Sequence, residues 1–214
     1  MTTLFFVRHG QSTSNLLRVF AGQTDFPLTD LGLRQAERVA VFLKQNFSLD
    51  AIYASDLTRT MQTAAPTAKL YGLDIIAMTD LRERCMGIWE GKTNQEISEQ
   101  YHDLYQAWIR RTGVYPEGAE VPDEYRERAR RALRKIIEES KGKSVAVYTH
   151  AGIINVLADD WKKTLPELNT IKVFENSSIT AIEYDDEGIA RRVILKNYQD
   201  HLGDDITVLP QELL

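Results

Sequence analysis

Five charged or titratable side chains follow short apolar runs of the sequence. They are Arg8, His9, Arg59, Glu83 and His150. Guanidinium groups bind phosphoryl oxygens through paired hydrogen bonds, and phosphoryl transfer is catalysed mainly by positioning and charge stabilisation. Two histidines, two arginines and a carboxylate at one place would therefore suit a reaction on a bound anion, and phosphate fits best.

Other nucleophiles used in phosphoryl transfer lack their usual surroundings. A cysteine phosphatase loop needs an arginine six residues after the cysteine, but position 91, six after Cys85, is glycine. No Asp-x-Asp follows a predicted strand. The "GKS" at 142–144 resembles the end of a P-loop, but Ile137 stands where its first glycine belongs, and the segment precedes a strand. Histidine is left as the nucleophile, a known covalent role of imidazole.

The apolar runs alternate with segments of helical periodicity. We predict strands at 4–7, 51–54, 75–77 and 144–148, and helices at about 29–46, 57–71, 122–141 and from 149 onward. This alternation predicts an α/β fold with a mostly parallel, helix-covered sheet. Ligands of such sheets bind beyond the carboxyl ends of the strands, which is where the five side chains would meet.

Two regions depart from the alternation. The capping box Thr93-Asn94-Gln95-Glu96 begins one helix whose apolar stripe runs to Trp108. No strand lies between this helix and the next, so we expect a helical cap insertion at about 90–122 over one edge of the sheet. Near the end, 180–184 and 190–196 flank "DDEG" and predict an antiparallel hairpin.

Bulk composition limits the function classes. The 214 residues suit one domain spanning 1–214, and a net charge of −5 argues against nucleic acid or an anionic membrane as partner. The single cysteine fits a reducing compartment, the apolar start ends at Val7 unlike a signal peptide, and no run approaches the ~18 apolar residues of a membrane span. We expect a cytoplasmic protein with no cofactor or metal, and a homodimer stays open.

Several short motifs occur together in a recognisable order. They are Arg8-His9-Gly10, Asn15, Phe20-x-Gly22, "PLTDLGLRQA", "SDLTRTMQTA", Glu83, "THAGII" and "NSSIT". In this order they resemble the histidine phosphatase (phosphoglycerate mutase-like) superfamily, from residue 4 to about 202. The resemblance implies the α/β fold of that superfamily and phosphoryl transfer from a small phosphate ester.

The resemblance also implies roles for individual residues. His9 would attack phosphorus and become a phosphohistidine, and Glu83 would protonate the leaving oxygen and later deprotonate the attacking water. The catalytic set would be completed by three residues that hold phosphoryl oxygens: Arg8, Arg59 and His150. Asn15 and the backbone near Gly22 would assist in binding the substrate. The flanking guanidinium groups should lower the pKa of His9 and keep it neutral.

The segment after Glu83 favours a phosphatase over a mutase. Glycolytic mutases of the superfamily carry an Asn-Lys pair here and a proline pair in a longer insertion, and both are absent. "MGIWEGKTNQEI" is more similar to the phosphatase branch, which includes broad-specificity enzymes and α-ribazole phosphatases. Met86 and Trp89, with Tyr105 and Trp108 as further candidates, would then supply an apolar lid over the leaving group. A mutase and a dedicated α-ribazole phosphatase remain as alternatives.

Two further classes stay open. His9, His150 and Glu83 match a 2-His-1-carboxylate metal site, although two arginines beside a dication are electrostatically unfavourable. The second open class is a phosphate-binding or scaffold protein without turnover. Such a protein would need the groups that hold the anion but neither the nucleophile nor the acid.

Overall fold

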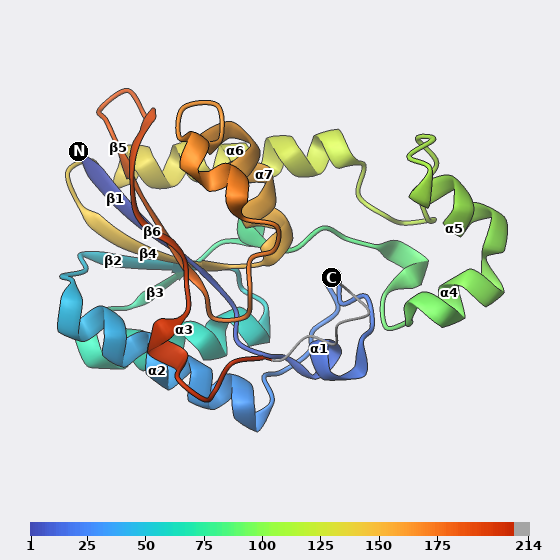
Figure 1. Cartoon of the computed structure of the whole chain (residues 1–214), viewed down its shortest axis with the longest axis horizontal. Coiled ribbons are helices and arrows are strands. Elements are labelled where there is room, and N and C mark those ends of the chain that lie inside the picture. Colours follow the sequence, from blue (N-terminus) through green and yellow to red (C-terminus); the bar gives the residue numbers. More distant parts are fainter. Residues whose placement is uncertain (208–214) are drawn as a thin grey trace.

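A computed structural model, which describes residues 1–207, contains one mixed sheet with strand order β3-β2-β4-β1-β5-β6 (Figure 1). The strands are β1 (Thr2–Arg8), β2 (Ala51–Ala54), β3 (Ile75–Ala77), β4 (Ser144–Thr149), β5 (Ile179–Tyr184) and β6 (Ala190–Tyr198). The first four run parallel, and β5 and β6 form an antiparallel hairpin whose β5 pairs with β1. The predicted α/β class, parallel core and hairpin are therefore confirmed.

Strand β1 lies in the interior of the sheet and is covered on both faces. Phe5 and Val7 pack against one helical layer, while Leu4 and Phe6 pack against the other. All four are almost completely buried. Because side chains alternate between the faces of a strand, a continuous apolar run is what a doubly covered strand requires.

The helices occupy both faces of the sheet. They are α1 (Thr13–Leu17), α2 (Asp30–Asn46), α3 (Thr58–Tyr71), α4 (Asn94–Gln100), α5 (His102–Ile109), α6 (Pro122–Glu139) and α7 (Ala151–Trp161). Figure 1 shows α2 and α3 on one face and α6 and α7 on the other. The Thr29 hydroxyl caps α2 by accepting from Gly32 N, and Gly72 ends α3 at φ +67°.

The segment that contains α4 and α5 lies beyond the edge of the sheet (Figure 1). Thr93 and Glu96 form the predicted capping box. The prediction of one continuous helix is wrong, because Tyr101 (φ −132°, ψ 41°) separates α4 from α5. The break allows residues from both helices, Ile97 and Trp108 among them, to pack around the fully buried Trp89.

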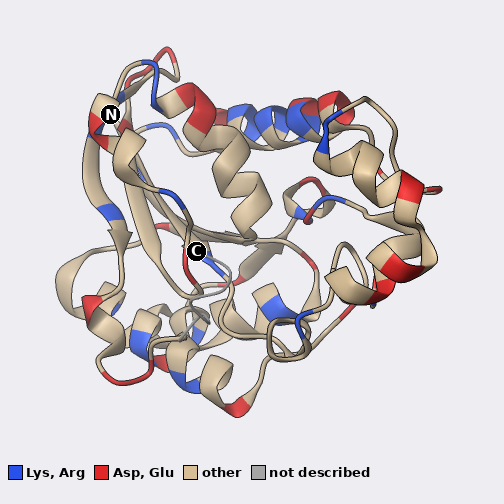
Figure 2. Cartoon of the chain, turned by 45° about the vertical axis from the view of Figure 1, so that its right-hand side comes forward, with Lys and Arg blue, Asp and Glu red and all other residues tan. Residues whose placement is uncertain are grey.

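The arginine-rich helix α6 carries charges of both signs along its length (Figure 2). Its arginines form ion pairs: Arg126 with Asp123, Arg130 with Asp160, Arg131 with Asp80, and Arg134 with Glu127. The positive charges of this helix are therefore largely balanced by neighbouring carboxylates. None of the helices within residues 1–207 is both long enough and apolar enough to cross a membrane.

Candidate active site

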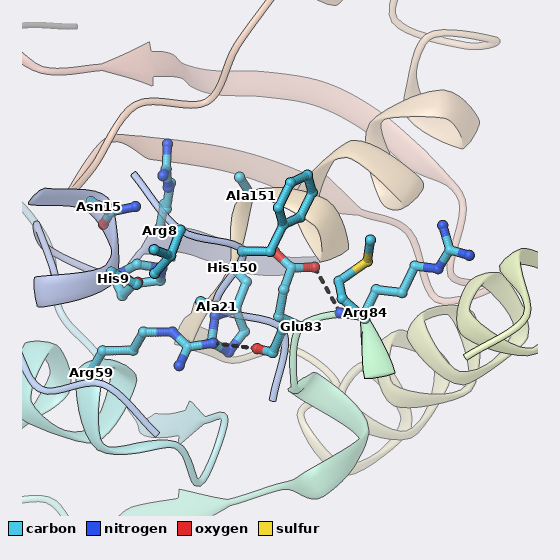
Figure 3. Close-up of a pocket in the computed structure, with 14 residues that line it drawn as sticks. Arg8, His9, Asn15, Ala21, Arg59, Glu83, Arg84, His150 and Ala151 are labelled. Carbon is cyan, nitrogen blue, oxygen red and sulfur yellow. Dashed lines mark hydrogen bonds between the residues drawn. The ribbon is translucent and has the colours of Figure 1, made fainter. Parts of the chain in front are cut away.

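A pocket of about 270 Å³ lies at the carboxyl ends of the parallel strands. The structure brings all of the predicted site residues to it: Arg8, His9, Asn15, Gly22, Arg59, Glu83 and His150. Figure 3 shows most of these side chains arranged around one space. Met86 also lines the pocket, but Trp89 does not, since it packs behind Phe20 (ring centroids 6.1 Å apart). The expected lid role of Trp89 is therefore wrong.

His9 follows β1 and is 6% exposed. Its backbone N–H donates to Thr149 O of β4 (2.9 Å), and its Nδ1 lies 2.7 Å from Gly10 O. Because a carbonyl oxygen only accepts, Nδ1 carries the hydrogen and Nε2 keeps a free lone pair. Burial, and then the charges of Arg59 and Arg8, hold the pKa of His9 well below its ordinary value. A neutral, nucleophilic imidazole is thus the stable form.

His150 is completely buried and meets the His9 ring edge-on, with ring centroids 5.3 Å apart. It occupies the N-cap position of α7, and its Nε2 lies 3.0 Å from Ser55 Oγ. Its Nδ1 is buried without a hydrogen-bond partner among residues 1–207. Burial, and then the Arg59 charge, hold the pKa of His150 well below its usual value. An unsatisfied ring nitrogen in the pocket wall is a group that a ligand can satisfy.

Arg59 lies in the first turn of α3 and is completely buried. Its Nη1 donates to Thr24 O (3.0 Å) and its Nη2 to Gly22 O (2.8 Å). Its Nε is buried with no partner in the described part of the chain. Burial lowers the pKa of Arg59 from its ordinary value, but a guanidinium remains charged under all conditions that a protein meets. The loop at 22–24 therefore fixes a buried cation against the pocket.

Glu90 organises that loop, a role that sequence reasoning missed. Its carboxylate accepts from the backbone N–H groups of Gln23 (3.0 Å), Thr24 (2.8 Å) and Met86 (2.9 Å) and from the Thr24 hydroxyl (2.6 Å). These bonds keep the pKa of Glu90 below its usual value although burial opposes the charged form. The loop thus uses its carbonyls for Arg59 and its amides for Glu90.

The second arginine, Arg8, ends β1. Its Nη1 donates to Phe174 O (2.6 Å), and its Nε is buried without a partner among residues 1–207. Burial lowers its pKa, and the charge of Glu175 opposes this change. The completely buried Arg59 and the partly buried Arg8 therefore line the same small pocket, and the Nε of each is buried without a partner among residues 1–207. This is a strongly anion-binding arrangement.

Asn15 has its side-chain oxygen already occupied. Its Oδ1 accepts from Ser12 N (3.0 Å) and from Asn176 Nδ2 (3.2 Å), and Asn176 also donates to His9 O (3.0 Å). The amide nitrogen of Asn15 is therefore the group left for a ligand, and it would add one more donor to the anion site.

Glu83 lines the opposite side of the pocket. Its Oε1 accepts from the Tyr125 hydroxyl (2.7 Å) and from Arg84 N (2.9 Å), while Oε2 accepts from Gly152 N (3.1 Å). The partnership with Tyr125 was also missed, because Tyr125 belongs to the apolar stripe of α6 and nothing in the sequence separates it from the other core residues.

A sequence comparison identifies the kind of protein to which this pocket belongs. The family model of the histidine phosphatase superfamily (branch 1) matches residues 4–196. The chain belongs to this superfamily. It is therefore an enzyme of a group that includes phosphatases, and all seven residues expected from the resemblance line one pocket of the superfamily fold.

Individual members of the superfamily support this assignment. The chain is 35% identical over 176 residues to phosphoglycerate mutase-like protein 4 of Arabidopsis thaliana, covering 81% of this chain and 75% of that one. It is 31% identical over 187 residues to the uncharacterized phosphatase PhoE of Bacillus subtilis, covering 87% and 91%. The solved structure of Bacillus stearothermophilus YhfR superposes with a TM-score of 0.84 at 29% identity, covering 94% and 100%.

Within residues 1–207, no three His, Cys, Asp or Glu side chains are grouped closely enough to hold a metal ion. Glu83 is instead held by neutral donors, and the positive charge of the pocket comes from Arg8 and Arg59.

Proposed function

We propose that the protein is a phosphatase that hydrolyses small phosphate monoesters through a phosphohistidine at His9. The observation that carries the proposal is the state of His9. The Gly10 carbonyl fixes hydrogen on Nδ1, and burial beside two guanidinium groups keeps the ring neutral, which leaves Nε2 as a nucleophile. A pocket of about 270 Å³ suits a small ester.

In the first step the phosphoryl group binds among the donors of the pocket. Arg8, Arg59 and His150, with Asn15, hold its oxygens and balance its charge. Nε2 of His9 attacks phosphorus, a P–N bond forms, and the bond to the leaving oxygen breaks. Glu83 gives its proton to that oxygen, so the product is a neutral alcohol and the carboxyl group becomes a carboxylate.

In the second step a water molecule replaces the alcohol. Glu83 accepts a proton from this water as its oxygen attacks phosphorus, and the P–N bond breaks. Inorganic phosphate leaves, His9 is again a neutral imidazole, and Glu83 is again protonated. The proton that Glu83 gave to the alcohol is thereby replaced by one from the water, and the enzyme is back in its starting state.

We propose that this reaction needs no metal ion. The guanidinium groups of Arg8 and Arg59 supply the positive charge that a metal would otherwise bring, and a dication beside them would be repelled. Full turnover in the presence of EDTA is the expected result, and activity that returns only on adding a divalent metal would contradict it.

The test of the proposed function uses His9→Ala with the exposed His102→Ala as its control. We expect wild type and His102→Ala to release phosphate from 4-nitrophenyl phosphate and to form an acid-labile phosphoenzyme. His9→Ala should do neither. A labelled phosphoenzyme that survives in His9→Ala would overturn the assignment of the nucleophile.

A mutase is the second candidate, because a relative at 35% identity bears a phosphoglycerate mutase-like name. Both candidates share the phosphohistidine and differ in whether the phosphoryl group passes to water or to a second substrate. Incubation with 3-phosphoglycerate and a bisphosphoglycerate primer separates them. We expect inorganic phosphate as the product, whereas a mutase would give 2-phosphoglycerate.

We further propose that residues 1–214 form a single domain with a cap insertion at about 90–122. Residues 208–214 of this domain lie outside the described residues. A cytoplasmic location belongs to the same proposal and rests on the single cysteine, Cys85.

A further inference from the structure

We propose that Tyr125 is a positioning residue that determines which oxygen of Glu83 carries the transferable proton. This inference rests on the proposed function, in which Glu83 protonates the leaving oxygen. It concerns the orientation of that carboxyl group, which the five predicted side chains alone do not fix.

Tyr125 lies in the first turn of α6 and is 6% exposed. Its hydroxyl donates to Glu83 Oε1 over 2.7 Å. Burial, and then the charge of Glu83, hold the pKa of Tyr125 well above its ordinary value, so the hydroxyl keeps its hydrogen throughout the working pH range. Tyr125 is therefore a permanent donor to one oxygen of the acid.

The two oxygens of Glu83 are unequally occupied. Oε1 accepts from both Tyr125 and Arg84 N, whose bond is drawn in Figure 3, so both of its lone pairs are used. Oε2 accepts only from Gly152 N. A carboxyl proton must occupy a lone pair that no donor already uses. When Glu83 is protonated, its hydrogen therefore lies on Oε2.

Gly152 makes this arrangement possible. A Cβ at position 152 would collide with Glu83 Oε1 and would lie 2.5 Å from the Tyr125 hydroxyl oxygen. The absence of a side chain lets the carboxyl group approach the beginning of α7 and accept from its backbone N–H. The sequence "HAG" thus combines a phosphate-facing histidine with space for the acid.

The arrangement has a consequence for the chemistry. As Oε2 gives up its hydrogen to the leaving oxygen, negative charge develops on the carboxyl group, and three hydrogen bonds stabilise that charge. Tyr125 keeps its own hydrogen and does not exchange it. This assistance matters most for strongly basic leaving groups such as alkoxides, and least for 4-nitrophenolate, which can leave with little protonation.

The experiment compares Tyr125→Phe with a matched control, Tyr53→Phe. Tyr53 is also buried and donates to a carboxylate, Glu139 (3.1 Å), but Glu139, unlike Glu83, does not line the pocket. For Tyr125→Phe we expect kcat/KM for an alkyl phosphate to fall about 10- to 100-fold, as for loss of a hydrogen bond to a charged group. The fall for 4-nitrophenyl phosphate should be several-fold smaller. Tyr53→Phe should leave the ratio of the two substrates unchanged.

A second variant, Gly152→Ala, displaces the carboxyl group by another route and should show the same dependence on the leaving group. Equal losses for both esters in Tyr125→Phe, or no loss at all, would overturn the inference. Glu83→Gln separates this failure from that of the proposed function. If Glu83→Gln shows a steep leaving-group dependence and Tyr125→Phe does not, only the role of Tyr125 is wrong. If wild type forms no phosphohistidine, the proposed function itself is wrong.

Discussion

The two halves of the pocket are built in different ways. The strand-end half, defined as Arg8, His9 and His150, is fixed by the backbone of adjacent strands, for example by His9 N donating to Thr149 O. The loop half, defined as residues 20–24 and 83–90, has no strand at its core. A substitution in the strand-end half therefore removes one side chain and leaves the backbone around it in place. A substitution in the loop half can shift the loop backbone and so displace pocket residues that are not themselves changed.

A few charged side chains hold the loop half in place by binding to its backbone. Glu90 accepts from three backbone N–H groups. On the other side, Arg128 donates to the carbonyls of Asp80 (2.9 Å), Arg82 (2.8 Å) and Glu83 (3.3 Å). Its own charge is balanced by Glu120 at 2.6 Å. These side chains hold the backbone of the loop half by hydrogen bonds, as the pairing of β1 with β4 holds the backbone of the strand-end half.

After His9→Ala, the largest effect is expected from another residue of the strand-end half, in His150→Ala. Loss of a group that stabilises charge in the transition state should lower kcat/KM about 100- to 1,000-fold. The frame should persist, because β4 and β1 pair through their backbones. Steady-state kinetics and urea unfolding at pH 7.5 measure the two quantities. A large loss of stability together with the loss of activity would contradict the distinction between the two halves.

A smaller effect, of a different kind, is expected from Glu90→Gln in the loop half. The NH2 group of the glutamine would face the backbone N–H of Thr24, to which it cannot bind, so we expect the loop at 22–24 to shift. Because Arg59 donates to the Thr24 carbonyl, Arg59 would shift with the loop. We expect affinity for orthovanadate or inorganic phosphate to fall about 10- to 100-fold. Glu96→Gln is the matched control, since the Glu96 carboxylate also accepts from a backbone N–H, but that of Thr93 at the start of α4 and not one of the loop at 22–24.

A double-mutant cycle tests whether Glu90 acts through Arg59. In an Arg59→Ala background, Glu90→Gln should lower anion affinity no further, because the group that it positions is gone. Independent, multiplying losses would show that Glu90 acts elsewhere, for example through Met86 N.

The same difference explains what the sequence could predict. An apolar run followed by a charged residue is a local pattern that can be seen in the sequence. Because ligands of parallel sheets bind at the carboxyl ends of the strands, the four such patterns, at 8–9, 59, 83 and 150, could be assigned to one site. Glu90 binds the backbone of Gln23 and Thr24, 67 and 66 positions away in the chain, and Tyr125 binds Glu83, 42 positions away, so no local spacing marks them. Glu83 was marked by the short apolar run before it and Glu96 by its capping box, whereas no pattern marks Glu90, which binds the loop at 22–24. The break at Tyr101 was missed because the stripe that crosses it keeps helical spacing.

The smallest expected effect is on the stability of the protein at acidic pH. It arises from His201, which contacts a segment that holds the strand-end half. His201 stacks on Phe42 and Tyr198, and its Nε2–H donates to Ser177 O (3.1 Å). Ser177 N in turn donates to Arg8 O (3.1 Å). Burial lowers the pKa of His201 from 6.5 to about 4. His201 is therefore protonated at a lower pH in the folded state than in the unfolded state.

The sign of the pH effect follows from that difference. Between pH 6.5 and about 4 the unfolded state binds one more proton at His201 than the folded state does, so stability falls as pH falls. The slope from this residue is up to about 1.4 kcal/mol per pH unit. His201→Gln keeps a donor for Ser177 O and removes the titration, so its free energy of unfolding should fall less steeply than that of wild type across this window. Urea unfolding between pH 7.5 and 4.5 measures both slopes, with the exposed His102→Gln as control. Parallel curves for wild type and His201→Gln would mean that His201 takes up its proton without opening the structure. The acid sensitivity of the strand-end half would then have to come from His9 and His150 alone.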